Sequence, residues 1–516
     1  MNVVLIALLL LPLAGAALTL APFGTDPEAA DRRALRLGTA VTGLVLLLTI
    51  ALAAGFDHGR PARMQAVTDV SWIPAVGVRL HLGVDGISLP LIVLTALLTF
   101  LCAVYSTKRL PDGPGVPSAR AFVGLLLLLE VGMLATFAVL DLVLFFLAFE
   151  IVLIPMYFLI ARWGSGQKVP AANRFILYTL LGSAVMLLGF LLIGSKAGTF
   201  DMTQLAAAHG HGLSHPTQVI AALCIGLGLA VKAPAWPLHS WLPDAHTSAP
   251  TVGSVLLAGV LLKMGTYGLV RVLLPIVPGG TATLAPYLGA LAAVGVVYGA
   301  LACLALVRPG AKGDLKRLIA FSSVGHMGFV LLGIASLTPV GVNGALFANI
   351  AHGLITGLLF FLVGALKDRY GTADLDTLAG ATGAALYGRA PRIGALLAFA
   401  AVASLGLPGL AGFWGEVLAM FGAFDPAAGL SRPAFVTYMV IAGLGTLLTA
   451  AYLLLVVKRV CMGDPKQPAL ADVPDMRPYE AVSWTPLAAL TLLAGLWPAL
   501  LLGLSDPAVK HLLGGG

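Results

Sequence analysis

The chain has 516 residues, of which 59% are hydrophobic and 10% are charged, and its mean hydropathy is +0.98. This composition excludes a soluble domain and indicates a protein whose solvent is lipid. The net charge of +7 would suggest a nucleic-acid partner in a soluble protein. In a membrane protein the positions of the basic residues matter more than their sum, so we predict no nucleic-acid partner.

Apolar runs of helix-spanning length recur along the whole chain. Each can supply the ~20 residues that a helix needs to cross a ~30 Å hydrocarbon core. We predict an all-α polytopic membrane protein, a single membrane domain over residues 1–516 with about fourteen transmembrane helices. The first run, Met1 to Pro22, lacks the basic start of a signal peptide, so we expect it to remain as the first helix. The runs are centred near residues 10, 45, 96, 129, 151, 184, 225, 260, 294, 328, 353, 407, 445 and 493.

The basic residues of the loops fall unequally on the two sides of the predicted membrane. Of the 30 Lys and Arg residues, one set of alternate loops holds 21 and the opposite set holds 7, while Lys232 and Lys263 lie within apolar runs. Because cytoplasmic loops collect basic residues, this bias supports an even number of spans and predicts that both termini lie outside the cytoplasm.

The loops between the runs are short and carry none of the motifs of a soluble catalytic site. No nucleotide-binding glycine loop, Walker motif or HExxH pattern stands in a strand-to-helix setting. The four cysteines are scattered singly, without the spacing of a disulfide framework, a zinc site or an iron–sulfur site. His209, His211 and His215 resemble a metal cluster, but in a glycine-rich external loop an incidental grouping is the favoured interpretation. We predict no metal and no cofactor in this chain.

Four ionisable residues lie at membrane depth, namely Glu150, Lys232, Lys263 and Glu416. Burying such a group in lipid costs ~3 kcal/mol or more, so each needs a partner, a water-filled cavity or a neutral form. Glu150 and Lys263 stand near the centres of their runs. Pro234 and Pro237 closely follow Lys232, and Gly406, Pro408, Gly409 and Gly412 precede Glu416. Lys232 and Glu416 are therefore expected in helices that break within the bilayer.

Broken helices expose backbone groups, which persist at this depth only inside protein or beside water. A pair of them in the two halves of one chain is typical of an inverted-repeat transporter. We predict that the seventh and twelfth helices are broken and that two inverted five-helix repeats form the core. The predicted units are 1–118 (helices 1–3), 119–275 (first repeat, helices 4–8), 283–460 (second repeat, helices 9–13) and 480–516 (helix 14).

Three further polar residues within apolar runs, Glu130, His326 and His352, extend the set of charges. Histidine exchanges protons near neutral pH, so Lys, His and Glu side chains joined by water can form a proton relay. A structural interpretation stays open, because a buried Glu–Lys pair can simply tie helices together and a histidine can bond a backbone carbonyl. The number of midplane charges favours the functional interpretation. Asp244 and His246 are predicted to be cap or loop residues that close a re-entrant turn, rather than gating groups.

Four segments make the sequence similar to a known family. They are LDLVLFFLAFEIVLIPMYFLI around Glu150, VKAPAWPLHSWLPDAHTSAPTVGSVLLAGVLLKMGTYGL around Lys232 and Lys263, KRLIAFSSVGHMGFV around His326, and GLPGLAGFWGE ending at Glu416. Together they resemble the proton-translocating antiporter-like family, which includes three large membrane subunits of respiratory complex I and the multisubunit Na⁺/H⁺ antiporters. The resemblance covers nearly the whole chain.

Within that family the sequence resembles the M-type subunits of complex I. Most relatives carry lysine in the broken twelfth helix, whereas the M-type subunits carry glutamate, as at Glu416. Glu130 and His352 also match positions typical of that type. The chain ends soon after the last apolar run, so we expect no long lateral helix of the L-type subunits.

The resemblance implies a role for each charged residue. Glu150 and Lys232 would form a charge pair, Lys263 would be the central relay, and Glu416 would hand protons to the exit. It also implies that the chain holds no redox centre and that NADH oxidation and quinone reduction in other subunits supply the energy. L- and N-type antiporter-like subunits, small membrane subunits and lipid would be its neighbours in a bacterial inner membrane. A subunit of a multisubunit Na⁺/H⁺ antiporter and a structural membrane scaffold remain the alternatives.

Overall fold

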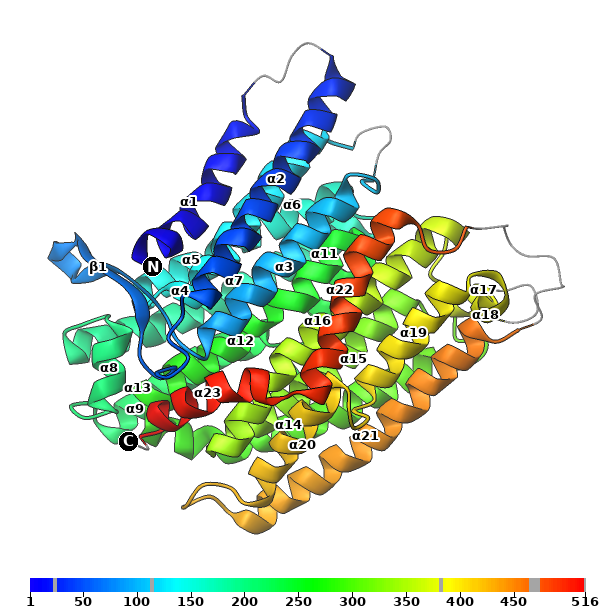
Figure 1. Cartoon of the computed structure of the whole chain (residues 1–516). Coiled ribbons are helices and arrows are strands. Elements are labelled where there is room, and N and C mark those ends of the chain that lie inside the picture. The colour runs from blue at the N-terminus through cyan, green and yellow to red at the C-terminus, as the bar shows by residue number, and fades with distance from the viewer. Residues whose placement is uncertain (22–25, 112–115, 380–383, 464–473, 515–516) are drawn as a thin grey trace.

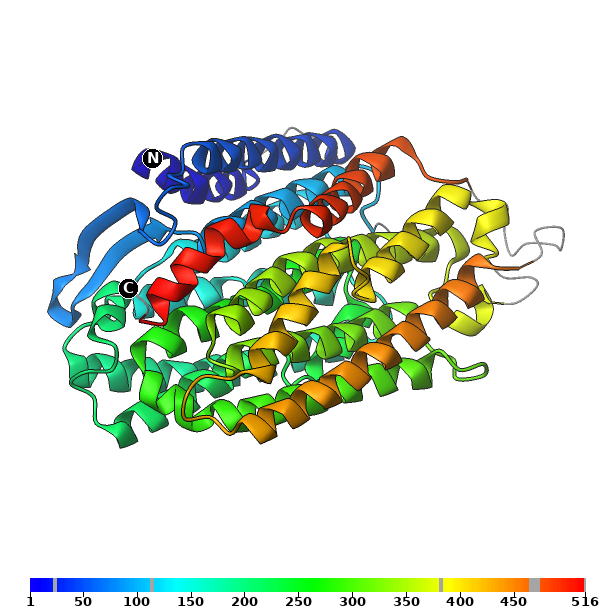
Figure 2. The same ribbon diagram turned by 60° about the horizontal axis from the view of Figure 1, so that its bottom comes forward.

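The computed structural model describes residues 1–21, 26–111, 116–379, 384–463 and 474–514 of the chain. The long helices of this part run side by side and form an elongated bundle (Figure 1, Figure 2). The two ends of the chain lie at the same end of the bundle, next to a two-stranded hairpin (Figure 1). Lys466, one of the basic residues counted above, lies outside the described residues.

The helices follow one another along the chain with short connections. Those of the first half are α1 Asn2–Leu18, α2 Pro27–Ala54, α3 Ser88–Ser106, α4 Ala119–Ala138, α5 Leu142–Ile151, α6 Leu153–Trp163, α7 Lys168–Ala197, α8 Met202–Ala208, α9 His215–Lys232, α10 Trp241–Ser248, α11 Thr251–Leu256, α12 Leu262–Gly268 and α13 Leu274–Ile276. Those of the second half are α14 Pro278–Leu306, α15 Leu315–Ala335, α16 Pro339–Tyr370, α17 Leu375–Leu378, α18 Leu386–Arg389, α19 Pro391–Ser404, α20 Ala411–Phe424, α21 Arg432–Cys461, α22 Pro478–Leu496 and α23 Ala499–Leu512.

Within the described residues, 11 helices are long and apolar enough to cross a membrane, and the α22–α23 pair, bent by 66°, can supply one more. Three shorter apolar helices, α1, α19 and α20, fall below that length. The structure therefore describes a multi-pass membrane protein. If α1 counts as one span and α19 with α20 as one broken span, the arrangement has room for the predicted fourteen, and that number stays a prediction.

Both predicted helix interruptions are present. Helix α9 ends at Lys232 and α10 begins only at Trp241, while α19 ends at Ser404 and α20 begins at Ala411. In the second interruption Gly406 and Gly409 have φ of +71° and +91°, a conformation that residues with a Cβ rarely adopt. Glycine and proline thus end both helices inside the bundle, as the sequence predicts.

Two matching bridges relate the two halves of the chain. Asp141 pairs with Asp201, and Asp314 pairs with Asp374, in short antiparallel bridges. All four aspartates cap helix N-termini with their side chains. The second bridge follows the first by the same number of residues on both of its strands. This repetition agrees with the predicted five-helix units, whose boundaries stay a prediction.

A β-hairpin between α2 and α3 is where the described chain departs from the all-α prediction. Strands β1 Gln65–Ile73 and β2 Val78–Val84 pair in antiparallel register around a short turn that ends at Gly77, whose φ is +71°. No predicted apolar run covers this segment, which lies between the runs centred near residues 45 and 96. His81 of β2 holds the hairpin to the bundle, since its Nδ1 lies 2.7 Å from Asp201 Oδ2 in a buried ion pair.

This ion pair makes the docking of the hairpin dependent on pH. The hydrogen bond to Asp201 raises the pKa of His81 above 6.5, and nearby Asp69 raises it further while Arg79 opposes it. Burial would raise the pKa of Asp201, but hydrogen bonds from His81, Thr203 and the start of α8 outweigh it and lower that pKa to about 2. The contribution of His81 is complete below about pH 6.5 and is lost as the pH rises through its raised pKa. That of Asp201 is lost only as the pH falls from about 4 towards 2.

We therefore expect the hairpin to loosen as the pH rises from 6 to 9. Trypsin cleavage after Arg79, at the start of the paired segment, is the measurement. To remove the pH response of the protease, the rate is divided by that of a His81→Gln variant at the same pH. The ratio should rise with pH in the native chain, and a ratio that stays level would show that the pair does not hold the hairpin.

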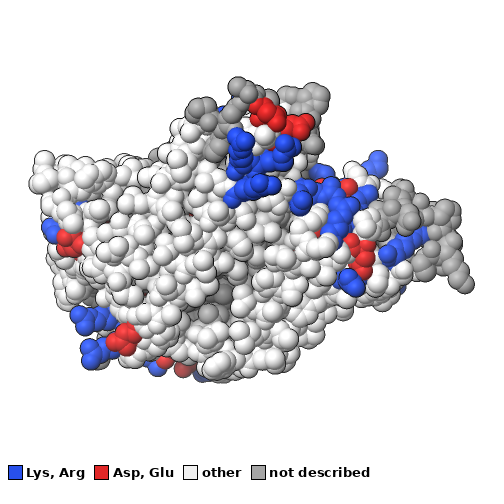
Figure 3. All heavy atoms as spheres, turned by 45° about the horizontal axis from the view of Figure 1, so that its top comes forward, with Lys and Arg blue, Asp and Glu red and all other residues white. Residues whose placement is uncertain are grey.

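Charged side chains gather at the ends of the bundle. On the face shown in Figure 3, Lys and Arg side chains concentrate at the end away from the chain termini, with fewer at the opposite end, and the broad middle is almost uncharged. Exposed leucines such as Leu181 and Leu447 belong to the sides of this bundle. An uncharged belt between two charged ends is the surface that a lipid bilayer requires.

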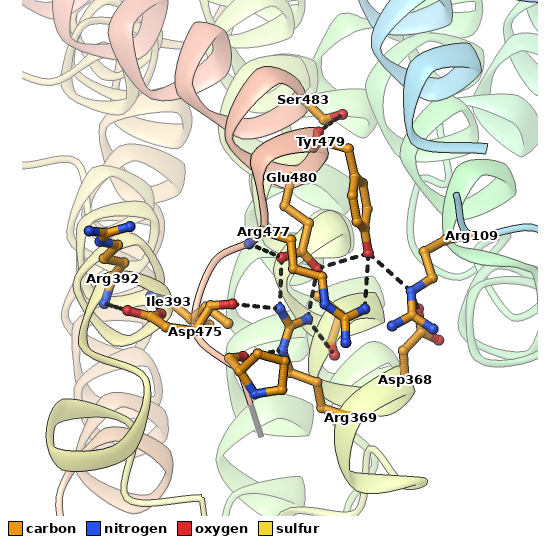
Figure 4. A network of polar contacts seen from close by, with 12 residues as sticks. Arg109, Asp368, Arg369, Arg392, Ile393, Asp475, Arg477, Tyr479, Glu480 and Ser483 are labelled. Carbon is orange, nitrogen blue, oxygen red and sulfur yellow. Dashed lines mark hydrogen bonds and ion pairs between the residues drawn. The ribbon is translucent and has the colours of Figure 1, made fainter. Parts of the chain in front are cut away.

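A polar network at the basic end fastens α22 to α16 and α3 (Figure 4). Arg369 donates two hydrogen bonds of 2.7 Å to the carboxylate of Glu480, and both side chains are about 1% exposed. Tyr479 accepts a bond of 3.0 Å from Arg109 at the end of α3. Arg369 also donates to the backbone carbonyl of Asp475, whose carboxylate accepts from the start of α19.

Replacing Glu480 by alanine is expected to weaken the fold strongly, because it leaves the Arg369 guanidinium buried without its carboxylate. Loss of one partner of a buried ion pair costs about 3–5 kcal/mol. The thermal midpoint of the purified protein in detergent measures the effect. Glu28→Ala, which breaks the exposed pair of Glu28 and Arg32, is the control and should change the midpoint little. Equal midpoints for the two variants would contradict the role given to the network.

Candidate functional site

Glu150 and Lys232 lie close to each other but not in direct contact. Lys232 is the last residue of α9 and is fully buried. Its Nζ donates to the backbone oxygen of Phe149 at 3.4 Å and lies 4.2 Å from the centre of the Phe149 ring. Glu150 is the next residue of α5, and its Oε1 is buried without a hydrogen-bond partner in the described structure. The two residues of the predicted charge pair thus lie near each other, and the charge pair itself stays a prediction.

Lys263 stands in an unusual helix. Two π-helical turns, η2 Leu257–Leu261 and η3 Leu269–Leu273, flank α12, which carries it. Such turns are rare and often occur at functional sites. Lys263 is fully buried, and its Nζ lies 2.5 Å from the backbone oxygen of Ala258, within the first π turn, and 2.6 Å from Nδ1 of His352. The lysine therefore joins the first half of the chain to α16 of the second.

From His352 the line of polar groups continues to the second broken helix. The rings of His352 and His326 are 5.7 Å apart between centroids. Nδ1 of His326 lies 3.3 Å from Oε1 of Glu416, and its Nε2 lies 2.9 Å from the hydroxyl of Ser404. Thr446 donates to the other oxygen of Glu416 at 3.4 Å. Lys263, His352, His326 and Glu416 thus follow one another across the interior.

A small cavity lies within this line. It has a volume of about 20 Å³ and is lined by both histidines, Glu416, Ser404 and apolar side chains. A buried space of this size holds about one water molecule. The four side chains and one water can pass a proton from group to group over short distances, because each is a donor, an acceptor or both.

Glu130 stands apart from this line in the described structure. It lies in α4, is fully buried, and neither of its carboxyl oxygens has a hydrogen-bond partner among the described residues. Burying a carboxyl group without a hydrogen-bond partner is costly. The structure brings together Lys263, His352, His326 and Glu416, and it does not join Glu130 to them.

Two residues that were predicted to lie in loops or caps are buried. Lys316 is in the first turn of α15, and its Nζ donates to the backbone oxygen of Ala249 at 2.9 Å. His246 lies in α10, stacked on Phe360 with 4.5 Å between ring centres, and neither ring nitrogen has a partner in the described structure. The signal that was available for Lys316 is its position at the first residues of an apolar run.

The histidine cluster of the outer loop does not assemble into a metal site. Among the described residues, no three His, Cys, Asp or Glu side chains gather in a way that could hold a metal ion. His215 instead lies 3.4 Å from the hydroxyl of Thr283.

A bundle of apolar helices with two internal breaks and a buried line of Lys, His and Glu defines a multi-pass membrane protein with an ionisable interior. A family model described as "NADH:quinone oxidoreductase/Mrp antiporter, TM" matches residues 139–444. The NADH-quinone oxidoreductase subunit M of Rhodobacter capsulatus is 39% identical over 517 aligned residues, which cover 98% of this chain and 95% of that protein. The chain therefore belongs to the NADH:quinone oxidoreductase/Mrp antiporter transmembrane family.

Solved structures agree with this assignment. A chain of respiratory complex I from Thermus thermophilus with bound NADH is similar with a TM-score of 0.83 and 30% identity, covering 99% of this chain and 100% of that one. A chain of the Mrp complex from Dietzia has a TM-score of 0.80 at 24% identity, covering 99% of this chain and 52% of that one, and it shares the fold. The chain is a member of a family whose members work in multisubunit membrane complexes.

Proposed function

We propose that this chain is a proton-translocating membrane subunit of an NADH-quinone oxidoreductase. The observation that carries the proposal is a line of four side chains, Lys263, His352, His326 and Glu416, which connects the two halves of the chain. Lys263 Nζ lies 2.6 Å from His352 Nδ1, the rings of His352 and His326 are 5.7 Å apart between centroids, and His326 Nδ1 lies 3.3 Å from Glu416 Oε1. Buried ionisable residues in a membrane are expensive, and a connected line of them is best explained by proton transport. The similarity to NADH-quinone oxidoreductase subunits supports the choice of complex.

The neighbouring residues Glu150 and Lys232, in the first half of the chain, supply a way to drive proton transfer. When Glu150 approaches Lys232, its negative charge favours the protonated amine, and when it withdraws, the amine gives up its proton towards Lys263. Moving one charge against ~100 mV costs ~2.3 kcal/mol, so a modest rearrangement of a buried pair is sufficient. The contact of Lys232 with Phe149, in place of Glu150, corresponds to the separated arrangement. Glu416, at the second helix break, would then pass protons to the exit.

The remaining features of the proposal concern the setting of the chain. It contributes no redox centre of its own, and quinone reduction elsewhere in the complex supplies the energy. L- and N-type antiporter-like subunits lie on either side of it with small membrane subunits, in a bacterial inner membrane with both termini outside the cytoplasm. The two bridges of paired aspartates support two related units over 119–275 and 283–460, with 1–118 and 480–516 flanking them.

A subunit of a multisubunit Na⁺/H⁺ antiporter is the alternative, and it has weaker support. The Mrp chain shares only 24% identity with this one, whereas the Rhodobacter capsulatus protein shares 39%. Purifying the tagged chain from its native membrane in mild detergent separates the two. Co-purification of NADH:quinone reductase activity is expected, and a complex that lacks this activity but exchanges Na⁺ for H⁺ would overturn the proposal.

A further inference from the structure

The segment that carries Lys263 packs closely against α16. The two backbones approach each other at Gly259 of the π turn η2 and Gly353 of α16, where a Cβ on Gly353 would lie 2.9 Å from the backbone oxygen of Gly259. About one turn further along η2 and α12, Lys263 Nζ lies 2.6 Å from Nδ1 of His352. The geometry of this contact therefore depends on how α12 is turned relative to α16.

A second polar contact joins the same two helices beyond Lys263. Thr266 follows Lys263 by three residues and Asn349 precedes His352 by three, so each pair lies on one face of its helix. The Thr266 hydroxyl lies 3.0 Å from Oδ1 of Asn349 and 3.1 Å from the backbone oxygen of Lys263. Thr266 and Asn349 are both fully buried. The hydroxyl is thus placed to donate either across to α16 or within its own turn.

The side-chain amide of Asn349 is costly in this position. Its Nδ2 is buried and has no hydrogen-bond partner among the described residues. Leaving a buried donor unpaired is unfavourable, whereas an apolar side chain of similar shape would pack here without that cost. In the described part of the chain, the contact of Oδ1 with Thr266 is the hydrogen bond that offsets this cost.

The local helix alone does not fix the direction in which Lys263 points. The seven-residue helix α12 is flanked by the π turns η2 and η3. Such turns are rare and are wider than the α-helical turns around them. If η2 changed to an α-helical turn with a shift of one residue, α12 would rotate by about 100°. That rotation would carry Lys263 away from His352, and a contact between α12 and α16 on the same face opposes it.

We propose that Thr266 and Asn349 are positioning residues, whose contact fixes the rotation of α12 so that the Lys263 amine stays against Nδ1 of His352. Neither side chain carries the proton. Their contact keeps the amine and the imidazole at a distance over which a proton passes directly. The inference rests on the proposed function and adds to it two residues that control the geometry of its central step.

The experiment compares two substitutions of one residue in the intact complex, reconstituted in sealed vesicles and driven by NADH. Thr266→Val keeps the branched shape but removes the hydroxyl, while Thr266→Ser keeps the hydroxyl. Proton transport per assembled complex should fall at least about fivefold in Thr266→Val, because a displacement of ~1 Å between reacting groups can cost ~100-fold. Thr266→Ser should stay within about twofold of the native rate.

Thr95→Val is the matched control. Thr95 is also a fully buried threonine, and its hydroxyl donates at 2.7 Å to the backbone oxygen of Leu91 within its own helix α3. Its replacement should leave transport per assembled complex within about twofold of the native rate. The amount of assembled complex, measured on native gels, is determined for every variant, because a purely structural role changes that amount and leaves transport per complex unchanged.

Asn349→Leu tests the other side of the contact and should also lower transport at least about fivefold. Because the two residues act as one unit, Thr266→Val combined with Asn349→Leu should be no worse than the poorer single variant. Near-native transport per complex in Thr266→Val or Asn349→Leu would overturn the inference. So would a Thr266→Ser variant as impaired as Thr266→Val, or effects that multiply in the double variant.

Lys263→Ala distinguishes failure of this inference from failure of the proposed function. If Lys263→Ala is inactive while Thr266→Val transports protons normally, the proposed function stands and the positioning role is wrong. If Lys263→Ala is itself fully active, the proposed function has failed.

Discussion

Replacing Lys263 by alanine is expected to lower proton transport by the complex at least about 100-fold, the usual scale for loss of a group that transfers protons. Its Nζ is one of the contacts between the two halves of the chain, 2.6 Å from Nδ1 of His352. Without the amine, His352 Nδ1 loses its partner and the line from the first half to Glu416 is cut. The initial rate of NADH-driven acidification of reconstituted vesicles measures the effect.

Lys263→Arg separates charge from proton release. Arginine keeps the positive charge but does not release its proton in proteins, so this variant should be as inactive as Lys263→Ala. Lys510→Ala, which removes an exposed lysine paired with Asp506, serves as the control and should pump normally. Full activity of Lys263→Arg would mean that Lys263 only supplies charge, and it would contradict its role as a relay.

Replacing either member of the Glu150 and Lys232 pair is expected to have the second large effect. Lys232→Ala removes the proton carrier, and Glu150→Gln removes the charge that controls it, so each should reduce proton transport at least about tenfold. The complex should still assemble, because in the described structure Lys232 bonds the backbone oxygen of Phe149 and not the Glu150 carboxylate.

The double variant tests whether the two residues act as one unit. Residues that act together are strongly non-additive, so Glu150→Gln combined with Lys232→Ala should be no worse than the poorer single variant. The same vesicle assay, with assembly checked on native gels, gives the three rates. Effects that multiply would show that the two residues act independently and would rule out the proposed control of Lys232 by Glu150.

Local features of the chain could be predicted well from sequence. The breaks after Lys232 and before Glu416 follow from proline and glycine within a few residues, since these residues interrupt helices wherever the chain goes. The positions of Glu150 and Lys263 near the centres of the apolar spans Leu142–Trp163 and Thr251–Ile276 follow equally directly from the lengths of the apolar runs. These predictions depend only on neighbours along the chain.

Features that depend on distant neighbours could not be predicted in this way. The contact of Lys263 with His352 joins two helices far apart in sequence, and it depends on the π-helical turn that contains Ala258. Lys316 was predicted to lie in a loop. Its amine bonds the backbone oxygen of Ala249, a residue distant in sequence, and this contact cannot be predicted from the sequence around Lys316. The hairpin was missed because its two strands pair with each other and dock on residues distant in sequence, through the His81–Asp201 ion pair and the bridge of Leu82 with Val139.

The number of protons transported per NADH oxidised tests the central claim most directly. It is measured with the complex in sealed vesicles, comparing the native chain with Lys263→Arg, which keeps the buried charge and removes only the ability to release a proton. We expect the ratio to fall clearly in the variant. An unchanged ratio, with NADH oxidation proceeding at the native rate, would show that protons do not pass through Lys263.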